Sequence, residues 1–97
     1  MAAHDSADAP RVPALEYPLV YTFKVMGLAS DGFAEHARRL VEAALGPGEG
    51  PAEQVRIRRS AGGKYHSVSV VVRLVSEEQR RAVYLALKAD AQVVYYL

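Results

Sequence analysis

Few residues of this chain could carry acid–base or nucleophilic chemistry. It contains three histidines and no cysteine, and the lack of cysteine excludes thiol catalysis, thiolate metal sites and disulfides. His66 is the one histidine that falls within a predicted strand, next to Ser67 and Ser69. Successive side chains of a strand point to opposite faces, so no Ser–His pair can form within this strand. His66 is a candidate pH switch, against the more common alternative of a strand-end histidine satisfied by backbone or water.

Metal and phosphate sites find no support in the sequence. The histidines are scattered and no Asp or Glu stands at ligand spacing beside them, so we expect neither a metal site nor a cofactor. Residues 62–64 (Gly-Gly-Lys) resemble the end of a phosphate-binding loop. That motif needs a following helix whose amides hold the anion, whereas a strand pattern follows here and favours a hairpin turn. The sequence therefore predicts no catalytic residue and no enzyme.

Positive charge is concentrated in the second half of the sequence. Between Gln54 and Val75 there are five Lys or Arg residues and no Asp or Glu, although the whole chain has a net charge of only +1. Such a surface suits a nucleic-acid backbone, a phosphorylated metabolite or an acidic protein partner. The alternative is a solvated face on which Lys and Arg discourage the pairing of sheet edges. The anion or partner face predicted from strand alternation comprises Lys24, Arg56, Arg58, Tyr65, Ser67, Ser69 and Arg73.

The elements that position these residues follow from hydrophobic periodicity. Alternating apolar residues predict strands over residues 19–26, 54–58, 65–75 and 93–97. Helical spacing of apolar residues predicts helices over residues 31–45 and 77–89. We expect Ser30 or Asp31 to cap the first helix, and residues 76–79 (Ser-Glu-Glu-Gln) have the form of a capping box for the second.

This order of elements predicts the fold class and the domain organisation. Strand, helix, strand, strand, helix, strand is the order of the ferredoxin-like βαββαβ sandwich, an α+β fold with two helices on one face of a four-stranded antiparallel sheet. The first and third strands are expected in its centre. A length of 97 residues with 51% hydrophobic and 24% charged residues suits one small domain. We assign it to residues 17–97, with a flexible N-terminal arm over residues 1–16 and a Gly- and Pro-rich loop at 46–51. Neither a signal peptide nor a transmembrane span is predicted, so a cytoplasmic location away from membranes is expected.

Within this topology, nucleic acid is the less favoured ligand. An RNA-recognition domain with the same order of elements presents aromatic residues on its first and third strands for base stacking. The open face here offers Tyr65 alone, with Thr22, Ser67 and Ser69 where the rings would be needed. Nucleic-acid or other anion binding through this face therefore stays the alternative prediction.

Two segments, residues 23–27 (FKVMG) and 63–69 (GKYHSVS), resemble the YbeD family of small bacterial proteins of unassigned function. The likeness extends over about residues 17–97. The resemblance implies a ferredoxin-like fold similar to ACT-type regulatory domains, which bind small effectors and often pair through their sheets. It implies no catalytic residues.

The turn between the first strand and the first helix is the candidate effector site. Its residues are Gly27, Leu28, Ser30 and Asp31, followed by Gly32. Glycines at both ends let a ligand approach the backbone, and a helix N-terminus offers free amides to a carboxylate. The resemblance points to the same turn, because ACT-like domains bind amino acids there. The alternative is that these residues serve only to turn the chain and cap the helix.

The final strand predicts self-association. Residues 93–97 are apolar on both faces, and a single-layer sheet needs only one apolar face, so Val94 and Tyr96 are expected to leave apolar surface uncovered. In a ferredoxin-like sheet this strand lies at an edge, where unpaired backbone groups can pair with a second copy. A short strand, or an arm folded back through Val12 and Leu15, would oppose this. The sequence thus predicts a small regulatory or adaptor domain that binds an effector or a protein partner, with a weak homodimer.

Overall fold

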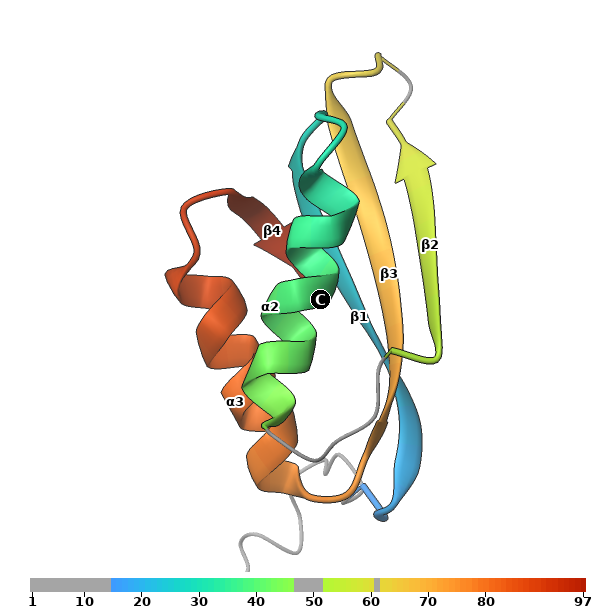
Figure 1. Ribbon diagram of the computed structural model, residues 1–97, viewed down its shortest axis with the longest axis vertical. Coiled ribbons are helices and arrows are strands. Elements are labelled where there is room, and N and C mark those ends of the chain that lie inside the picture. Colours follow the sequence, from blue (N-terminus) through green and yellow to red (C-terminus); the bar gives the residue numbers. More distant parts are fainter. Residues whose placement is uncertain (1–14, 47–51, 61) are drawn as a thin grey trace, which may run out of the picture.

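A four-stranded antiparallel sheet carries two helices on one face. The computed structural model describes residues 15–46, 52–60 and 62–97. In chain order the elements are β1 (Leu19–Leu28), α2 (Phe33–Leu45), β2 (Gln54–Arg59), β3 (Tyr65–Leu74), α3 (Glu77–Ala89) and β4 (Val93–Tyr96). The strand order is β2-β3-β1-β4, with β1 and β3 in the centre. Figure 1 shows both helices in front of the sheet, and the β2–β3 hairpin extending beyond them. The ferredoxin-like α+β fold predicted from the sequence is confirmed.

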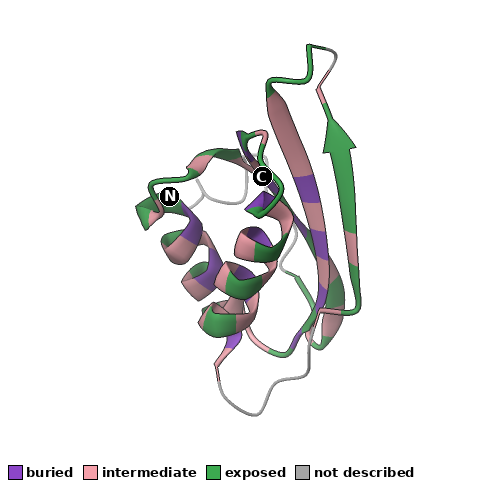
Figure 2. Cartoon of the chain, turned by 45° about the horizontal axis from the view of Figure 1, so that its top comes forward, coloured by how far each residue is buried: buried purple, intermediate pink, exposed green. Residues whose placement is uncertain are grey.

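The core lies between the helices and the inward face of the two central strands. Strand alternation places every second residue there, as the burial pattern of β3 shows, and Figure 2 shows the buried bands of the helices and β3 facing one another while β2 is exposed over most of its length. The buried residues are Phe23, Val25, Phe33, Ala37, Val41, Leu45, Val68, Val70, Val72, Leu74, Val83 and Leu87. The opposite face of the sheet is left without a covering layer among the described residues.

The predicted helix starts have different outcomes. Ser76 caps α3 as expected, because its Oγ accepts a hydrogen bond from the Gln79 amide at 3.2 Å. The prediction for α2 is wrong. Gly32 is the N-cap residue and no side chain caps it, since the helix starts at Phe33 and leaves Ser30 and Asp31 in the preceding turn. Ser30 contributes only its backbone carbonyl, which accepts from the Phe33 amide at 3.3 Å.

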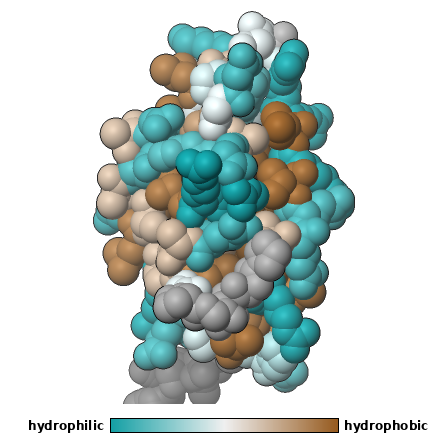
Figure 3. All heavy atoms as spheres, viewed as in Figure 1, coloured by the Kyte–Doolittle hydropathy of each residue, from teal (hydrophilic) through white to brown (hydrophobic). Residues whose placement is uncertain are grey.

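Polar contacts join the two helices at both ends of the helical layer. The side-chain amide of Gln79 donates a hydrogen bond from Nε2 to the Leu45 carbonyl at 3.3 Å. This bond joins the start of α3 to the end of α2. At the other end, His36 Nε2 lies 2.9 Å from both carboxylate oxygens of Asp90. The outer surface of the layer is hydrophilic across its middle (Figure 3). Within α2, Arg38 pairs with Glu35 and Glu42.

An irregularity in the β1–β4 pairing changes which face of β4 is exposed. The register shifts between Met26 and Gly27, so that Gly27 pairs with Val93 but Met26 pairs with Tyr95. Val94 is the extra residue, and the alternation after it is inverted. Val94 is exposed as expected, but the prediction for Tyr96 is wrong: Tyr96 packs on the helical side against Tyr84, with ring centroids 5.8 Å apart.

Parts of the predicted organisation fall outside the described residues. Of the arm predicted over residues 1–16, the structure describes only Leu15 and Glu16, and of the loop at 46–51 only Gly46. Among the described helices, neither has the length and apolar character needed to cross a bilayer.

Candidate functional site

The predicted cationic face is built from rows of residues that cross the sheet. On the open side Ser67 lies opposite Met26 of β1 and Arg58 of β2, and Ser69 lies opposite Lys24 and Arg56. The two serines are small residues in the central strand, whereas long side chains stand on both neighbouring strands. The open face is therefore hollowed along β3.

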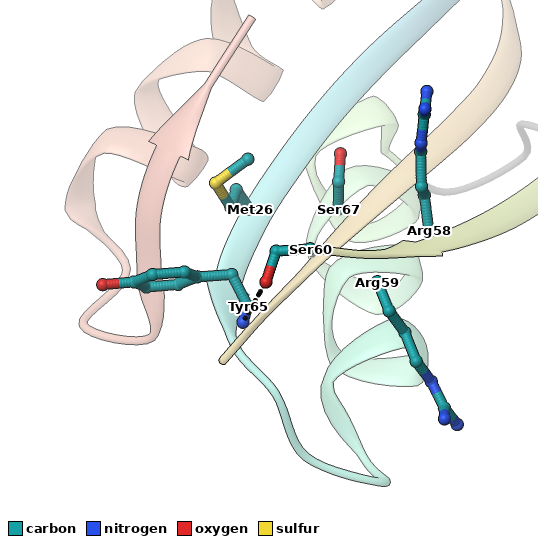
Figure 4. Close-up of a pocket in the computed structure, with 6 residues that line it drawn as sticks. All are labelled: Met26, Arg58, Arg59, Ser60, Tyr65 and Ser67. Carbon is teal, nitrogen blue, oxygen red and sulfur yellow. Dashed lines mark hydrogen bonds between the residues drawn. The ribbon is translucent and has the colours of Figure 1, made fainter. Parts of the chain in front are cut away.

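This hollow, which we call the serine trough, has a defined lining. Two adjoining pockets with volumes of about 440 Å³ and 610 Å³ share Arg58 and Ser67. Figure 4 shows Arg58 and Arg59 pointing to opposite sides of β2, with the Tyr65 ring pointing away from that strand. Arg73, also predicted on this face, pairs with Val20 farther along β3 and does not line the trough. The lining residues are Thr22, Lys24, Met26, Arg56, Ile57, Arg58, Arg59, Ser60, Tyr65, Ser67, Ser69 and Val71.

The charges of the trough differ from those of the helical layer. None of the four strands contains an acidic residue, and within the described residues neither Lys24 nor the trough arginines pair with a carboxylate. Arg56 donates to the side-chain amide oxygen of Gln54 at 3.0 Å. All four helical arginines, by contrast, are in ion pairs: Arg38, Arg39, Arg80 and Arg81. The trough therefore gathers several positive charges that no carboxylate of the described residues pairs with.

The hairpin turn fixes one end of the trough. Gly63 has a φ of 72°, a conformation that favours glycine, and its amide donates to the Ser60 carbonyl at 2.9 Å. The Ser60 hydroxyl accepts from the Tyr65 amide at 3.1 Å. Lys64 lies over the Tyr65 ring, with its Nζ 5.6 Å from the centroid. The hairpin predicted in place of a phosphate loop is confirmed.

The turn predicted as an effector site does border a pocket. Its volume is about 290 Å³, and it lies between this turn and the α3–β4 connection. Leu28 and Ser30 line it, whereas Asp31 and Gly27 do not. Gly27 is needed for packing, because a Cβ there would come within 2.4 Å of the Phe33 ring. The full lining is Leu28, Ala29, Ser30, Phe33, Ala91, Gln92 and Val94, and includes no charged residue.

His66 is not brought together with any other chemical group. It pairs with Gly27 and Arg59 in the sheet and is half-buried, and its ring makes no hydrogen bond with the described residues. The described residues contain no cluster of three or more side chains that could bind a metal ion.

Two polar clusters were missed by sequence reasoning. One is the His36–Asp90 pair. Burial of Asp90 by itself raises the pKa of its carboxyl, but hydrogen bonds from His36 and from the Gln92 amide outweigh this and lower the pKa. The order of elements carried a signal for this pair, because the two helices of a βαββαβ sandwich run antiparallel and bring the first turn of one beside the last turn of the other.

The second missed cluster joins β1 to α3. The Tyr21 and Tyr84 hydroxyls are 2.9 Å apart, and Arg80 Nε donates to the Tyr21 hydroxyl at 3.2 Å. Burial, followed by the hydrogen bond with Tyr21, raises the pKa of Tyr84 to about 12. Only the apolar positions of these tyrosines were evident from periodicity, since the hydroxyl contacts depend on how α3 crosses the sheet.

Comparison with known proteins identifies the family. Residues 13–97 match the model of a family described as protein of unknown function (DUF493). The chain is 40% identical to a UPF0250 protein of Ralstonia nicotianae over 87 residues, covering 90% of this chain and 88% of that protein. It is 36% identical over 84 residues to a UPF0250 protein of Bordetella pertussis, covering 87% and 90% of the two chains.

Solved structures agree on the fold. The solution structure of protein HP0495 from H. pylori superposes with a TM-score of 0.71 at 18% identity, covering 94% of this chain and 92% of that one. The resemblance inferred from residues 23–27 and 63–69 is thereby confirmed at the level of family and fold. The chain belongs to the DUF493 family, whose curated relatives are bacterial UPF0250 proteins and whose function is unknown.

Proposed function

We propose that this chain is a non-catalytic regulatory or adaptor domain that binds an acidic partner in the serine trough. The observation that carries the proposal is the contrast in charge pairing. The helical arginines are neutralised by neighbouring carboxylates, whereas Lys24, Arg56 and Arg58 surround a hollow on an acid-free sheet. Unpaired cations around a concave surface attract and orient an anionic partner.

A titration with an oligoglutamate peptide tests this proposal. We expect the amide NMR shifts of Ser67, Ser69 and their neighbours to move at low salt, with weaker binding as salt screens the charges. The double variant Arg56→Gln/Arg58→Gln should lose about tenfold in affinity, since two exposed charge contacts are removed. The double variant Arg81→Gln/Lys88→Gln makes the same change in net charge on the helical layer and should bind as the wild type does. If the trough amides do not move at low salt, the proposal is wrong.

Nucleic acid is tested in the same way. Single-stranded RNA and DNA would bind through phosphate contacts with a steep salt dependence, because each neutralised phosphate releases counterions. Tighter binding of either than of oligoglutamate at equal charge and salt, lost in the Arg56→Gln/Arg58→Gln variant, would replace the acidic protein partner by a nucleic-acid backbone.

A small effector at the turn is the second candidate. The observation that favours it is the pocket of about 290 Å³ beside Leu28 and Ser30. Its size and mixed lining suit an amino acid or another small carboxylic acid, held by the polar groups of Ser30 and Gln92 above an apolar floor. An NMR screen against such acids checks the idea through the amides of residues 27–32. If no acid moves them, the effector candidate is to be dropped.

A further inference from the structure

On the open face of the sheet, apolar side chains stand along the β4 edge and arginines along the β2 edge, with Met26 and Lys24 of β1 between them. One row across the sheet runs Tyr95, Met26, Ser67, Arg58, and the next runs Leu97, Lys24, Ser69, Arg56. Tyr95 and Leu97 are each 57% exposed. They stand on this side because of the shift in the β1–β4 register. In both rows an apolar residue lies at the β4 edge, a serine in the middle and an arginine at the β2 edge.

The occupant of such a face is not a β-strand. The backbone groups of β1 and β3 are already paired within the sheet, so an added strand could bind only at an outer edge. Where a sheet face is covered, the covering layer consists of helices or of a second sheet, and in this chain helices already form that layer on the other face (Figure 1). The outer strands β2 and β4 are three strand spacings apart, about 14 Å, which accommodates a helix with a diameter of about 10–12 Å.

The spacing of the arginines also matches a helix lying along β2. Arg56 and Arg58 are two residues apart on one strand, which corresponds to about 6.6 Å. Carboxylates at positions i and i+4 of a helix are separated by about 6 Å along its axis. Tyr95 and Leu97 have the same two-residue separation on the other side of the trough. A docked helix that also carries apolar residues at positions i and i+4 would therefore place one of them beside each of these two side chains.

We propose that the serine trough docks an amphipathic acidic α-helix of a partner protein. The apolar stripe of that helix lies on Met26, Tyr95 and Leu97, and its carboxylates face Arg56 and Arg58. The helix seats over Ser67 and Ser69, whose small side chains leave room for it. This inference rests on the proposed function and specifies the kind of acidic partner.

The test uses two synthetic peptides of identical composition, each of about 15 residues so that the helix is stable enough to form. In the first peptide Glu residues at i and i+4 form a stripe beside a Leu stripe of the same period. In the second the same residues are permuted so that both stripes are dispersed. Binding is followed by amide NMR shifts and by the helical circular-dichroism signal of the peptide. We expect the striped peptide to bind at least tenfold more tightly, with shifts at Met26, Ser67 and Ser69.

Variants of the protein test the two edges of the face separately. Arg56→Gln/Arg58→Gln should weaken the striped peptide, and so should Tyr95→Ser, which alters an exposed side chain and leaves the core intact. The Arg81→Gln/Lys88→Gln variant is the matched control and should bind the striped peptide as the wild type does. Each variant is first shown to be folded by its amide spectrum.

The outcomes separate this inference from the proposed function. Equal affinity for the striped and permuted peptides, with oligoglutamate still moving the trough amides, would overturn the helix inference and leave the proposed function standing. If neither peptide nor oligoglutamate moves those amides, both fail. Tighter binding to phosphatidylglycerol vesicles or to single-stranded RNA than to the striped peptide, abolished by Arg56→Gln/Arg58→Gln, would also overturn the helix inference and assign the face to that surface instead.

Discussion

His36 Nε2 lies 2.9 Å from both carboxylate oxygens of Asp90. Asp90 is the residue that ends α3, and its Oδ1 also accepts a hydrogen bond from the Gln92 amide at 2.9 Å. A single carboxylate therefore holds together the first turn of α2, the end of α3 and the connection to β4.

Replacing Asp90 by Asn should destabilise the fold by about 1–3 kcal/mol, because a partly buried charged acceptor is lost. The hydrogen bonds to the carboxylate lower the pKa of Asp90 below its ordinary value of 3.8 despite its burial. Their contribution is present above that value and is lost as the pH falls through the lower pKa of the folded state. Urea unfolding at neutral and acid pH measures both effects, and Asp31→Asn, at an exposed position, is the control. Equal stability of Asp90→Asn and wild type at neutral pH would contradict the role given to this carboxylate.

Gly27→Ala should destabilise the protein by about 1–3 kcal/mol through overpacking. The added methyl group would lie 2.4 Å from Phe33 Cε1 and 2.6 Å from the Gln92 carbonyl oxygen, so the ring or the β4 connection must shift. Gly62→Ala is the matched control, because a Cβ there meets no atom within 4 Å. Thermal or urea unfolding compares the two variants, and similar midpoints for both would show that Phe33 relaxes without cost.

Tyr84 should lose its phenolic proton at a higher pH in the folded protein than in the unfolded chain. The pKa of Tyr84 is raised from 10.0 to about 12 by burial and then by the hydrogen bond with Tyr21. The folded state therefore retains a proton that the unfolded state has lost, so Tyr84 contributes stability below pH 10 that disappears between pH 10 and about 12. Phenolate absorbance against pH should show a late component that is absent in Tyr84→Phe and in protein unfolded by guanidinium. A late component that persists in Tyr84→Phe would assign it to another residue.

The two neighbouring tyrosines of β4 should differ in how much their substitution destabilises the protein. Tyr96 packs against Tyr84, so Tyr96→Ala should cost a few kcal/mol, whereas Tyr95→Ala, at an exposed side chain, should cost well under half as much. Urea unfolding provides the comparison. Equal losses would mean that the register shift at Val94 is not maintained.

The weak homodimer expected at the β4 edge needs variants that follow this register. Tyr96→Glu would disturb the core, so Val94→Lys and Leu97→Lys, both at exposed side chains, are the suitable changes. Sedimentation over a concentration series should show a wild type that associates and two variants that do so less. A wild type that stays monomeric at the highest concentration would remove the expectation, and a dimer unaffected by both variants would place the contact elsewhere.

The sequence was sufficient where structure follows from regular periodicity. Alternation along residues 65–74 identified both the buried valines and the outward serines, and the Ser76 capping box marked the start of α3. Alternation failed at Tyr96 because one extra residue in β4 inverts it, and no residue type at Val93 or Val94 signals a bulge. The serine trough could not be predicted as a hollow, since its shape depends on which residues of β1 and β2 stand opposite Ser67 and Ser69.

The contacts at both ends of the helical layer determine which part of the molecule can deform. Gln79 holds Leu45 at one end and Asp90 holds His36 at the other, so sliding of α2 along α3 would have to break polar contacts at both ends. We therefore expect the two helices to move together. The β2–β3 hairpin, which extends past the helices (Figure 1), has no such contacts with them among the described residues of its tip and is expected to deform more easily. A ligand seated between Arg58 and Ser67 would accordingly act by changing the twist of the sheet.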